Sequence, residues 1–189
     1  RSFKKEAPVP ALAVSVLTTT GASGEPLLPE QAAFDVRHVD LDLWVDPASK
    51  TIAGGMSLTA DVLSPLRRLV LHLDHHLSVD TVSVRRDLDL SPSPELVSDF
   101  RHQDGLITAD LKDILQPGET LLAHVEYGGS PRVAPRPPWD GGFTWARTED
   151  GQPWIATSCQ GEGADLWWPY KDPPSDKPET MDLHITVPA

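Results

Sequence analysis

The sequence lacks most of the features that would crosslink the chain, anchor it in a membrane or bind it to a polyanion. Cys159 is the one cysteine among 189 residues, which excludes an intrachain disulfide, a multi-thiolate zinc site and an iron–sulfur cluster. No run approaches the ~18 apolar residues that cross a bilayer, so we expect no membrane span. Basic residues are also scarce, and the formal net charge is -12. We therefore expect no nucleic-acid partner, because such a surface repels nucleic acids and anionic membranes.

Alternation of apolar and polar residues is what the sequence does contain. Hydrophobic residues make up 39% of the chain, enough for a normal core. Period-two runs follow one another through residues 36–127, and further strands are expected after them. The expected strands cover residues 39–45, 56–62, 69–73, 79–84, 106–111, 121–127, 143–146, 153–157 and 181–187. Helical spacing never persists beyond about ten residues. The sequence thus predicts an all-β fold, with saddle-like curved sheets packed as a β-sandwich.

Composition divides the chain into an arm, a β domain and an irregular segment within that domain. We expect residues 1–33 to form an extended amino-terminal arm, in which residues 11–18 are an extended arm or a strand, and residues 34–189 to form the domain. The Gly54-Gly55 pair directly before the run at 56–62 predicts a β-bulge. Residues 131–178 hold nine of the 19 prolines and five of the six tryptophans, which marks a Pro/Trp-rich irregular segment.

The most distinctive stretch of this segment is residues 157–176. Its prolines reduce the entropy lost on ordering and its tryptophans can bury large areas, so we expect it to be held rigid. Gln160, Glu162 and Asp165 would then be presented from a fixed backbone. We expect Cys159 to be a small buried filler, because no neighbouring Lys, Arg or His in the sequence is placed to lower its pKa.

Patterns of metal and nucleophile chemistry are weak in this sequence. It contains no His-Glu-x-x-His, and a solvated turn is the favoured explanation of the group His72, Asp74, His75 and His76. We therefore assign no metal and no catalytic residue to the chain. A Gly-x-Ser-x-Gly elbow is also absent. A glycosidase-like carboxylate pair of Glu162 and Asp165 is disfavoured, since acidic residues are common here.

Three stretches of this sequence carry a common resemblance: residues 34–43, residues 137–143 and several short pieces between 158 and 176. Together they resemble the amino-terminal domain of the gluzincin zinc aminopeptidases, the family of aminopeptidase N and leukotriene-A hydrolase, in particular its bacterial branch. Residues 34–43 resemble the first long strand of that family, and residues 137–143 resemble a loop of its bacterial members. The family's substrate-facing loop is similar to residues 158–164 together with 167–169, 171–172 and 174–176. The resemblance covers about residues 34–189.

The resemblance implies a substrate-anchoring role. In that family a Gln or Glu at the place of Gln160 helps to bind the free α-amino group of a peptide, and a carboxamide oxygen can accept such a hydrogen bond. The implied substrate-binding residues are Gln160, Ser158, Gly161, Glu162 and Gly163. Many relatives have Gln at the place of Ser158, Cys at that of Tyr170 and His or Glu at that of Pro173. The difference at Ser158 leaves the shape of the first specificity pocket open, whereas the other two differences are expected to affect packing only.

The family's catalytic parts lie outside this chain. Its zinc-binding His-Glu-x-x-His, its later zinc Glu and its Gly-x-Met-Glu-Asn strand all come downstream. The resemblance thus implies zinc in a longer parent protein and none bound by this chain. The implied partners are a peptide amino terminus as substrate and the missing catalytic domain in cis. The parent would remove amino-terminal residues with a zinc-polarised water, while this fragment alone would be inactive. The compartment stays open between a bacterial cytoplasm and periplasm.

A second hypothesis from a different class is a free-standing β-sandwich binding module. In that case Trp139, Trp145, Trp154, Trp167 and Trp168 would form a platform for carbohydrate or protein recognition. The competing interpretation, which we favour, is that these tryptophans hold together an irregular region that lacks regular strand ladders.

Overall fold

The computed structural model describes residues 27–87, 94–173 and 175–188. Of the predicted arm it describes residues 27–33, and the stretch 11–18 lies outside the described residues. Within the described part of the chain, all regular structure is β except for one short helical turn. The elements are β1 (Phe34–Asp46), β2 (Thr51–Val62), β3 (Leu66–His72), β4 (Leu77–Arg86), β5 (Val97–Gln103), β6 (Leu106–Leu115), β7 (Thr120–Gly129), β8 (Gly142–Arg147), β9 (Pro153–Ser158), η1 (Ala164–Leu166) and β10 (Thr180–Thr186). The predicted all-β class is confirmed.

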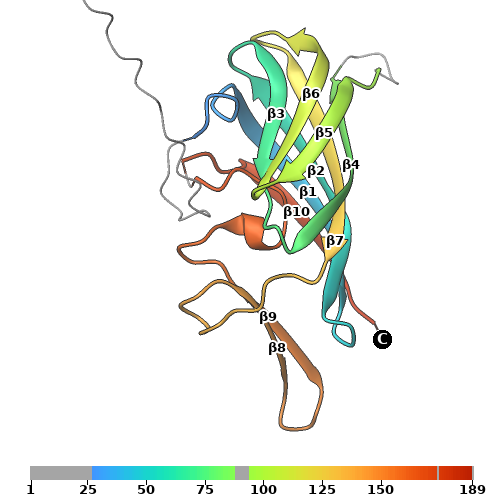
Figure 1. Ribbon diagram of the computed structural model, residues 1–189, viewed down its shortest axis with the longest axis vertical. Helices are drawn as coiled ribbons and strands as arrows, with labels where there is room; N and C mark the ends of the chain where they lie inside the picture. The colour runs from blue at the N-terminus through green and yellow to red at the C-terminus, as the bar shows by residue number, and fades with distance from the viewer. Residues whose placement is uncertain (1–26, 88–93, 174, 189) are drawn as a thin grey trace, which may run out of the picture.

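The largest sheet has five strands in the order β10-β1-β2-β7-β4 (Figure 1). All its pairs are antiparallel except β1 with β10, which are parallel. Along β1, Val39, Leu41 and Leu43 are buried, while Asp42 and Trp44, which point to the opposite face, are exposed. This is the alternation that the sequence predicted, and it gives the sheet one apolar and one polar face.

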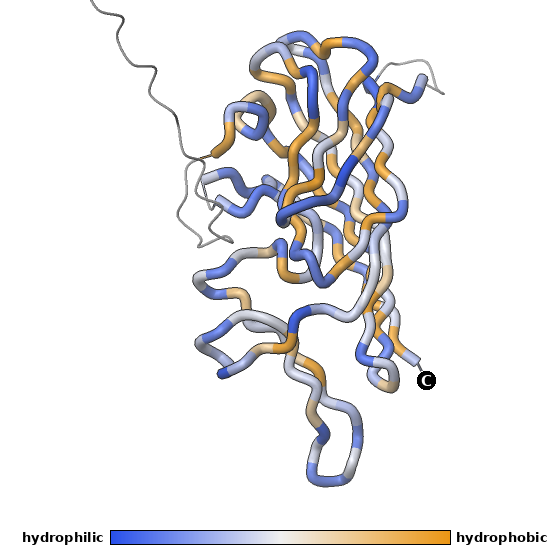
Figure 2. The backbone as a smooth tube through the Cα atoms, in the orientation of Figure 1, coloured by the Kyte–Doolittle hydropathy of each residue, from blue (hydrophilic) through white to orange (hydrophobic). Residues whose placement is uncertain are grey.

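A three-stranded sheet, in the order β3-β6-β5, packs on the apolar face of the larger sheet. The shared core joins Leu41, Met56 and Val125 of the first sheet to Leu71 and Ile107 of the second. In Figure 2 the hydrophobic residues recur along the strands of both sheets. Burying aliphatic side chains between two sheets is the main stabilising term of such a sandwich. The predicted β-sandwich is therefore confirmed.

Strand β5 was not predicted, because its sequence hardly alternates. Only Val97 and Phe100 offer large apolar side chains, and both are half-buried. The pairing of β5 with β6 also shifts register between Val97 and Asp99. One-residue shifts of this kind break a period-two pattern, so pairing with β6, and not the sequence of β5 itself, determines that this segment is a strand.

The predicted bulge at Gly54-Gly55 is wrong. Pairing between β1 and β2 runs without interruption through both glycines, and its irregularity lies between Val36 and His38. The glycines instead permit close approach. A Cβ on Gly54 would lie 2.0 Å from the carbonyl oxygen of Asp42, and one on Gly55 would lie 2.8 Å from the His124 ring.

The β8–β9 hairpin and the loop before it extend below the sandwich (Figure 1). A two-stranded hairpin is marginally stable on its own, and this one is joined to the core through Phe143 of β8, which is buried. Among the described residues, no helix is long and apolar enough to cross a membrane. The chain after β9 returns to the sandwich through η1 and ends in β10, and the candidate site lies on this return path.

Candidate functional site

The predicted substrate-binding residues form a tight turn between β9 and η1. The carbonyl oxygen of Cys159 accepts hydrogen bonds from the backbone N–H groups of Glu162 (3.2 Å) and Gly163 (3.0 Å). Gly161 has a φ of 85°, in the left-handed region that favours glycine at the third position of such a turn. Gln160 and Gly161 form the apex, and both are exposed. The Gln160 side chain is therefore available to a ligand.

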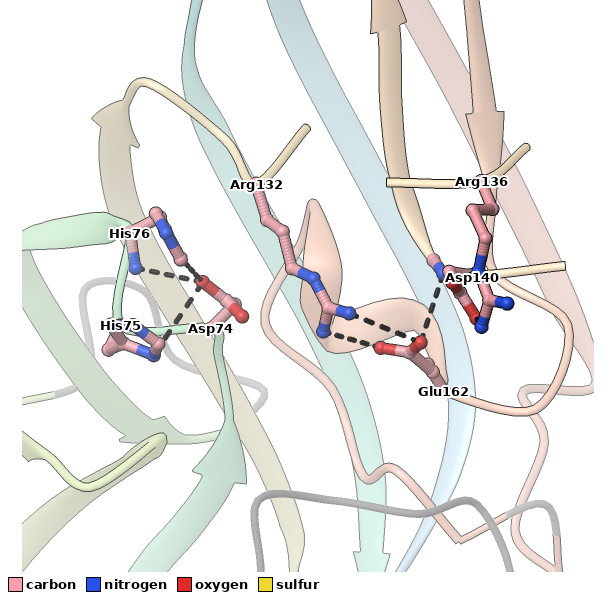
Figure 3. Close-up of polar contacts among 8 residues, drawn as sticks. Asp74, His75, His76, Arg132, Arg136, Asp140 and Glu162 are labelled. Carbon is pink, nitrogen blue, oxygen red and sulfur yellow. Dashed lines mark hydrogen bonds and ion pairs between the residues drawn. The ribbon is translucent and has the colours of Figure 1, made fainter. Parts of the chain in front are cut away.

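Glu162 fixes the far end of this turn. Its carboxylate accepts two hydrogen bonds from Arg132, with Nη1–Oε2 at 2.5 Å and Nη2–Oε1 at 3.3 Å (Figure 3). Oε1 also accepts the backbone N–H of Gly141 at 3.0 Å. Both carboxylate oxygens are thus already used within the chain. Contact between Glu162 and a substrate stays a prediction, whereas its structural contact is observed.

Ser158 and Gly163 flank the turn and shape its backbone. Ser158 ends β9, where it pairs with Gly142 of β8. Gly163 has a φ of 104°, and a Cβ there would lie 1.4 Å from Oδ1 of Asp172. No side chain fits at that position. The five predicted residues therefore lie in one turn, with its apex exposed and both of its ends held.

The segment after the turn is bound to three strands of the sandwich. The hydroxyl of Tyr127 in β7 donates to the carbonyl oxygen of Trp167 (2.9 Å). Tyr170 and His72 of β3 exchange backbone hydrogen bonds of 2.7 and 3.1 Å. Lys171, which is 2% exposed, reaches the start of β1. These contacts agree with the expected rigidity of this stretch.

Lys171 is a buried cation with three contacts. Its Nζ donates to the carbonyl oxygen of Phe34 (2.5 Å) and lies 3.6 Å from the centroid of the Phe34 ring. It also forms an ion pair with the buried carboxylate of Asp176. Burial lowers the pKa of Lys171, and the hydrogen bond and charge of Asp176 oppose that shift. Lys171 and Asp176 lie in the family-like motif, which implied no role for either. Arg132 was not predicted, because it lies 30 positions before its partner Glu162.

Asp165, the third acidic or amide residue singled out in this stretch, is half-buried. One of its carboxylate oxygens, Oδ1, is buried, and its backbone oxygen accepts the N–H of Asp74 at 2.9 Å. Burial and, after it, the negative charges of Asp172 and Asp74 together raise the pKa of Asp165 to about 7. Burial likewise raises the pKa of the Cys159 thiol. A thiol that stays protonated is a poor nucleophile, in line with the expected filler role.

The tryptophans do not form one exposed platform. Trp168 is buried, with Trp167 edge-on to it at a centroid distance of 6.3 Å. Trp145 stacks on Phe143 at 5.2 Å. By contrast, Trp139 and Trp154 are 79% and 50% exposed. Most of the set thus packs against the protein, as the favoured interpretation holds.

The histidine-rich turn is split between two environments. Asp74, His75 and His76 each bring one ligand atom within 4.8 Å of the others. Oδ1 of Asp74 already accepts the backbone N–H of His76 (2.8 Å) and lies 2.6 Å from its Nδ1. His72 is engaged elsewhere, since its Nδ1 accepts the N–H of Asp172 at 3.1 Å. These internal hydrogen bonds explain the grouping, and we assign no metal to it.

Comparison with known proteins identifies the fold. No protein-family profile and no curated protein matches this sequence. Among solved structures, an M1 zinc metallopeptidase from Deinococcus radiodurans matches 84% of this chain with a TM-score of 0.60 and 24% identity. The chain has the fold of an M1 aminopeptidase amino-terminal domain. A mutant of a two-domain M1 zinc metallopeptidase bound to L-arginine matches the same share at 25% identity and a TM-score of 0.59.

The chain is much shorter than the solved structures that it matches. It covers 33% of the Deinococcus protein and 34% of the two-domain protein. A third similar structure is a mutant of the Deinococcus enzyme bound to a Tyr-Ser-Ala substrate, with 24% identity and a TM-score of 0.58. The chain thus spans about a third of the length of the solved M1 structures that it matches.

Proposed function

We propose that this chain is the amino-terminal, substrate-anchoring domain of a zinc aminopeptidase, and that the longer protein containing it, here the parent protein, removes residues from peptide amino termini. The observation that carries the proposal is the exposed Gln160 at the apex of a turn whose two ends are held. The carboxamide oxygen of Gln160 accepts a hydrogen bond from an α-ammonium group. The fold of M1 zinc metallopeptidases supports the same proposal.

The zinc that the fold family implies does not fit this chain. The sequence contains no His-Glu-x-x-His, and the Asp74 group is already used by its own hydrogen bonds. Zinc would be held by other parts of the parent protein, which would also supply the remaining walls of the site. This chain would contribute recognition of the amino group and no catalytic residue.

Hydrolysis of aminoacyl-p-nitroanilides by the purified parent protein tests this function. We expect zinc-dependent turnover by the parent protein and none by residues 1–189 alone. Gln160→Ala should raise KM about tenfold or more, equivalent to losing one hydrogen bond to a charged group. Gln160→Glu should retain binding, because a carboxylate oxygen accepts the same bond. Gln152→Ala, at an exposed position near the tip of the β8–β9 hairpin, is the matched control and should leave KM unchanged. A parent protein without aminopeptidase turnover would contradict the proposal.

A further inference from the structure

The side chain of Arg132 reaches the turn from 30 positions before Glu162 in the sequence. Its guanidinium group grips Glu162 with two hydrogen bonds. The two side chains are 32% and 24% exposed, so the pair is partly shielded from water. A bidentate, charge-assisted pair of this kind fixes direction as well as distance. The grip acts directly on the last residue of the turn that carries Gln160.

The backbone of Arg132 is itself fixed, so that the pair closes a ring. The carbonyl oxygen of Arg132 accepts the N–H of Phe143 in β8 at 2.7 Å. Strand β8 pairs with β9, where Gly142 lies opposite Ser158. From Ser158 the chain runs through the turn to Glu162, whose carboxylate returns to Arg132. The turn is therefore held from both of its ends by one closed set of contacts.

Two glycines in this ring lie so close to neighbouring atoms that a side chain would not fit at either position. A Cβ on Gly141 would lie 2.5 Å from Cδ1 of Leu166 and 3.1 Å from the carboxylate carbon of Glu162. Gly142 has a φ of 134°, and a Cβ there would lie 2.5 Å from the carbonyl oxygen of Arg132. The Gly141-Gly142 pair thus lets the loop that carries Arg132 approach the turn closely enough for the ion pair to form.

We propose that Arg132, acting through Glu162, is a positioning residue that sets the direction of Gln160 toward the amino terminus of the substrate. This inference rests on the proposed function, and it assigns a role to a residue outside the predicted substrate-binding turn. Arg132 itself does not touch the substrate. Glu162 then serves as the link between the loop at 131–141 and the turn.

Kinetics of the parent protein provide the first test. Arg132→Met should raise KM for aminoacyl-p-nitroanilides about tenfold with a much smaller change in kcat, because the anchor is displaced while the reacting bond is not. Arg132→Lys should recover part of the loss, since lysine supplies the charge without the fork. Arg136→Met is the matched control, because Arg136 lies in the same loop, is 79% exposed and pairs with Asp140 instead.

A double-mutant cycle separates positioning from simple destabilisation. In a Gln160→Ala background, Arg132→Met should have no further effect on KM, since the group that it positions is gone. A purely structural role of Arg132 would add its full effect in both backgrounds. If Gln160→Ala raises KM and Arg132→Met does not, the positioning role is wrong while the proposed function stands. If Gln160→Ala itself leaves KM unchanged, the proposed function is wrong.

Hydrogen exchange provides a readout that needs no activity. In the parent protein, Arg132→Met should speed exchange in peptides covering residues 158–166, where Glu162 and Gly163 donate to Cys159. Arg136→Met should not. Unchanged exchange across the turn in the Arg132→Met protein would overturn the inference whether or not the parent hydrolyses peptides.

Discussion

Replacing Lys171 by methionine should destabilise this chain strongly. Methionine is similar in length, so the change removes the charge and leaves the packing volume nearly intact. The carboxylate of Asp176, itself 9% exposed, would then be buried without its cation. Breaking a buried ion pair by removing one partner costs about 3–5 kcal/mol. That is a large part of the roughly 5–15 kcal/mol that stabilises a typical domain.

Guanidinium unfolding followed by tryptophan fluorescence measures this loss, because Trp167 and Trp168 lie close to the pair in the sequence. Replacing both partners, as Lys171→Met with Asp176→Val, should recover most of the stability, since no unpaired charge remains. The control is Arg68→Met, which breaks a 2.6 Å pair with Asp110 whose side chains are 47% and 44% exposed. That change should cost under about 1 kcal/mol. A Lys171→Met protein as stable as the Arg68→Met protein would refute the reasoning.

Three further outcomes follow from the same structure. The stabilisation from protonated Asp165 is complete below its ordinary pKa of 3.8 and is lost as the pH rises through about 7, by about 1.4 kcal/mol per pKa unit. Asp165→Asn, which keeps a donor toward Asp172, should flatten this pH dependence when the free energy of unfolding is measured from pH 4 to 8. An unchanged pH profile would contradict the assigned role of Asp165. Gly163→Ala should unfold the turn or the chain, because the alanine Cβ would lie 1.4 Å from Oδ1 of Asp172. Circular dichroism and the melting temperature measure this loss of structure, and a melting temperature equal to that of the unaltered chain would contradict the close contact at Gly163. Leu41→Ala, at a side chain with 0% exposure, should lower the free energy of unfolding by about 2–5 kcal/mol. Leu183, its register partner, is 47% exposed, so Leu183→Ala should lower it far less in the same guanidinium unfolding assay. Equal losses would contradict the burial of Leu41.

The sandwich could be predicted from the sequence because its strands alternate strictly. Val39, Leu41 and Leu43 have the period that one buried face requires, and the structure buries all three. The same reasoning failed where tertiary contacts decide. Strand β5 pairs with β6 despite a polar sequence and a register shift. Gly54 and Gly55 suggested a bulge, yet they lie in regular pairing and make room for neighbouring atoms.

The candidate turn could be located from sequence only through its family-like motif. That motif singled out Gln160, and the structure places this residue at an exposed apex beside Gly161, whose backbone is left-handed. The contacts that hold the turn could not be predicted in this way. Arg132 is 30 positions from Glu162, and no local pattern links two residues so far apart. The partial burial of the Asp165 carboxyl could not be predicted either, because a stretch with several acidic residues gives no sign of which one packs against the protein.

A crystal structure of the parent protein with a bound peptide analogue that keeps its free α-amino group would test the central claim most directly. We predict that Oε1 of Gln160 lies within about 3.2 Å of the α-nitrogen, as a charge-assisted hydrogen bond requires. An α-nitrogen held entirely by other residues, with Gln160 directed away from the peptide, would contradict the proposed anchoring role.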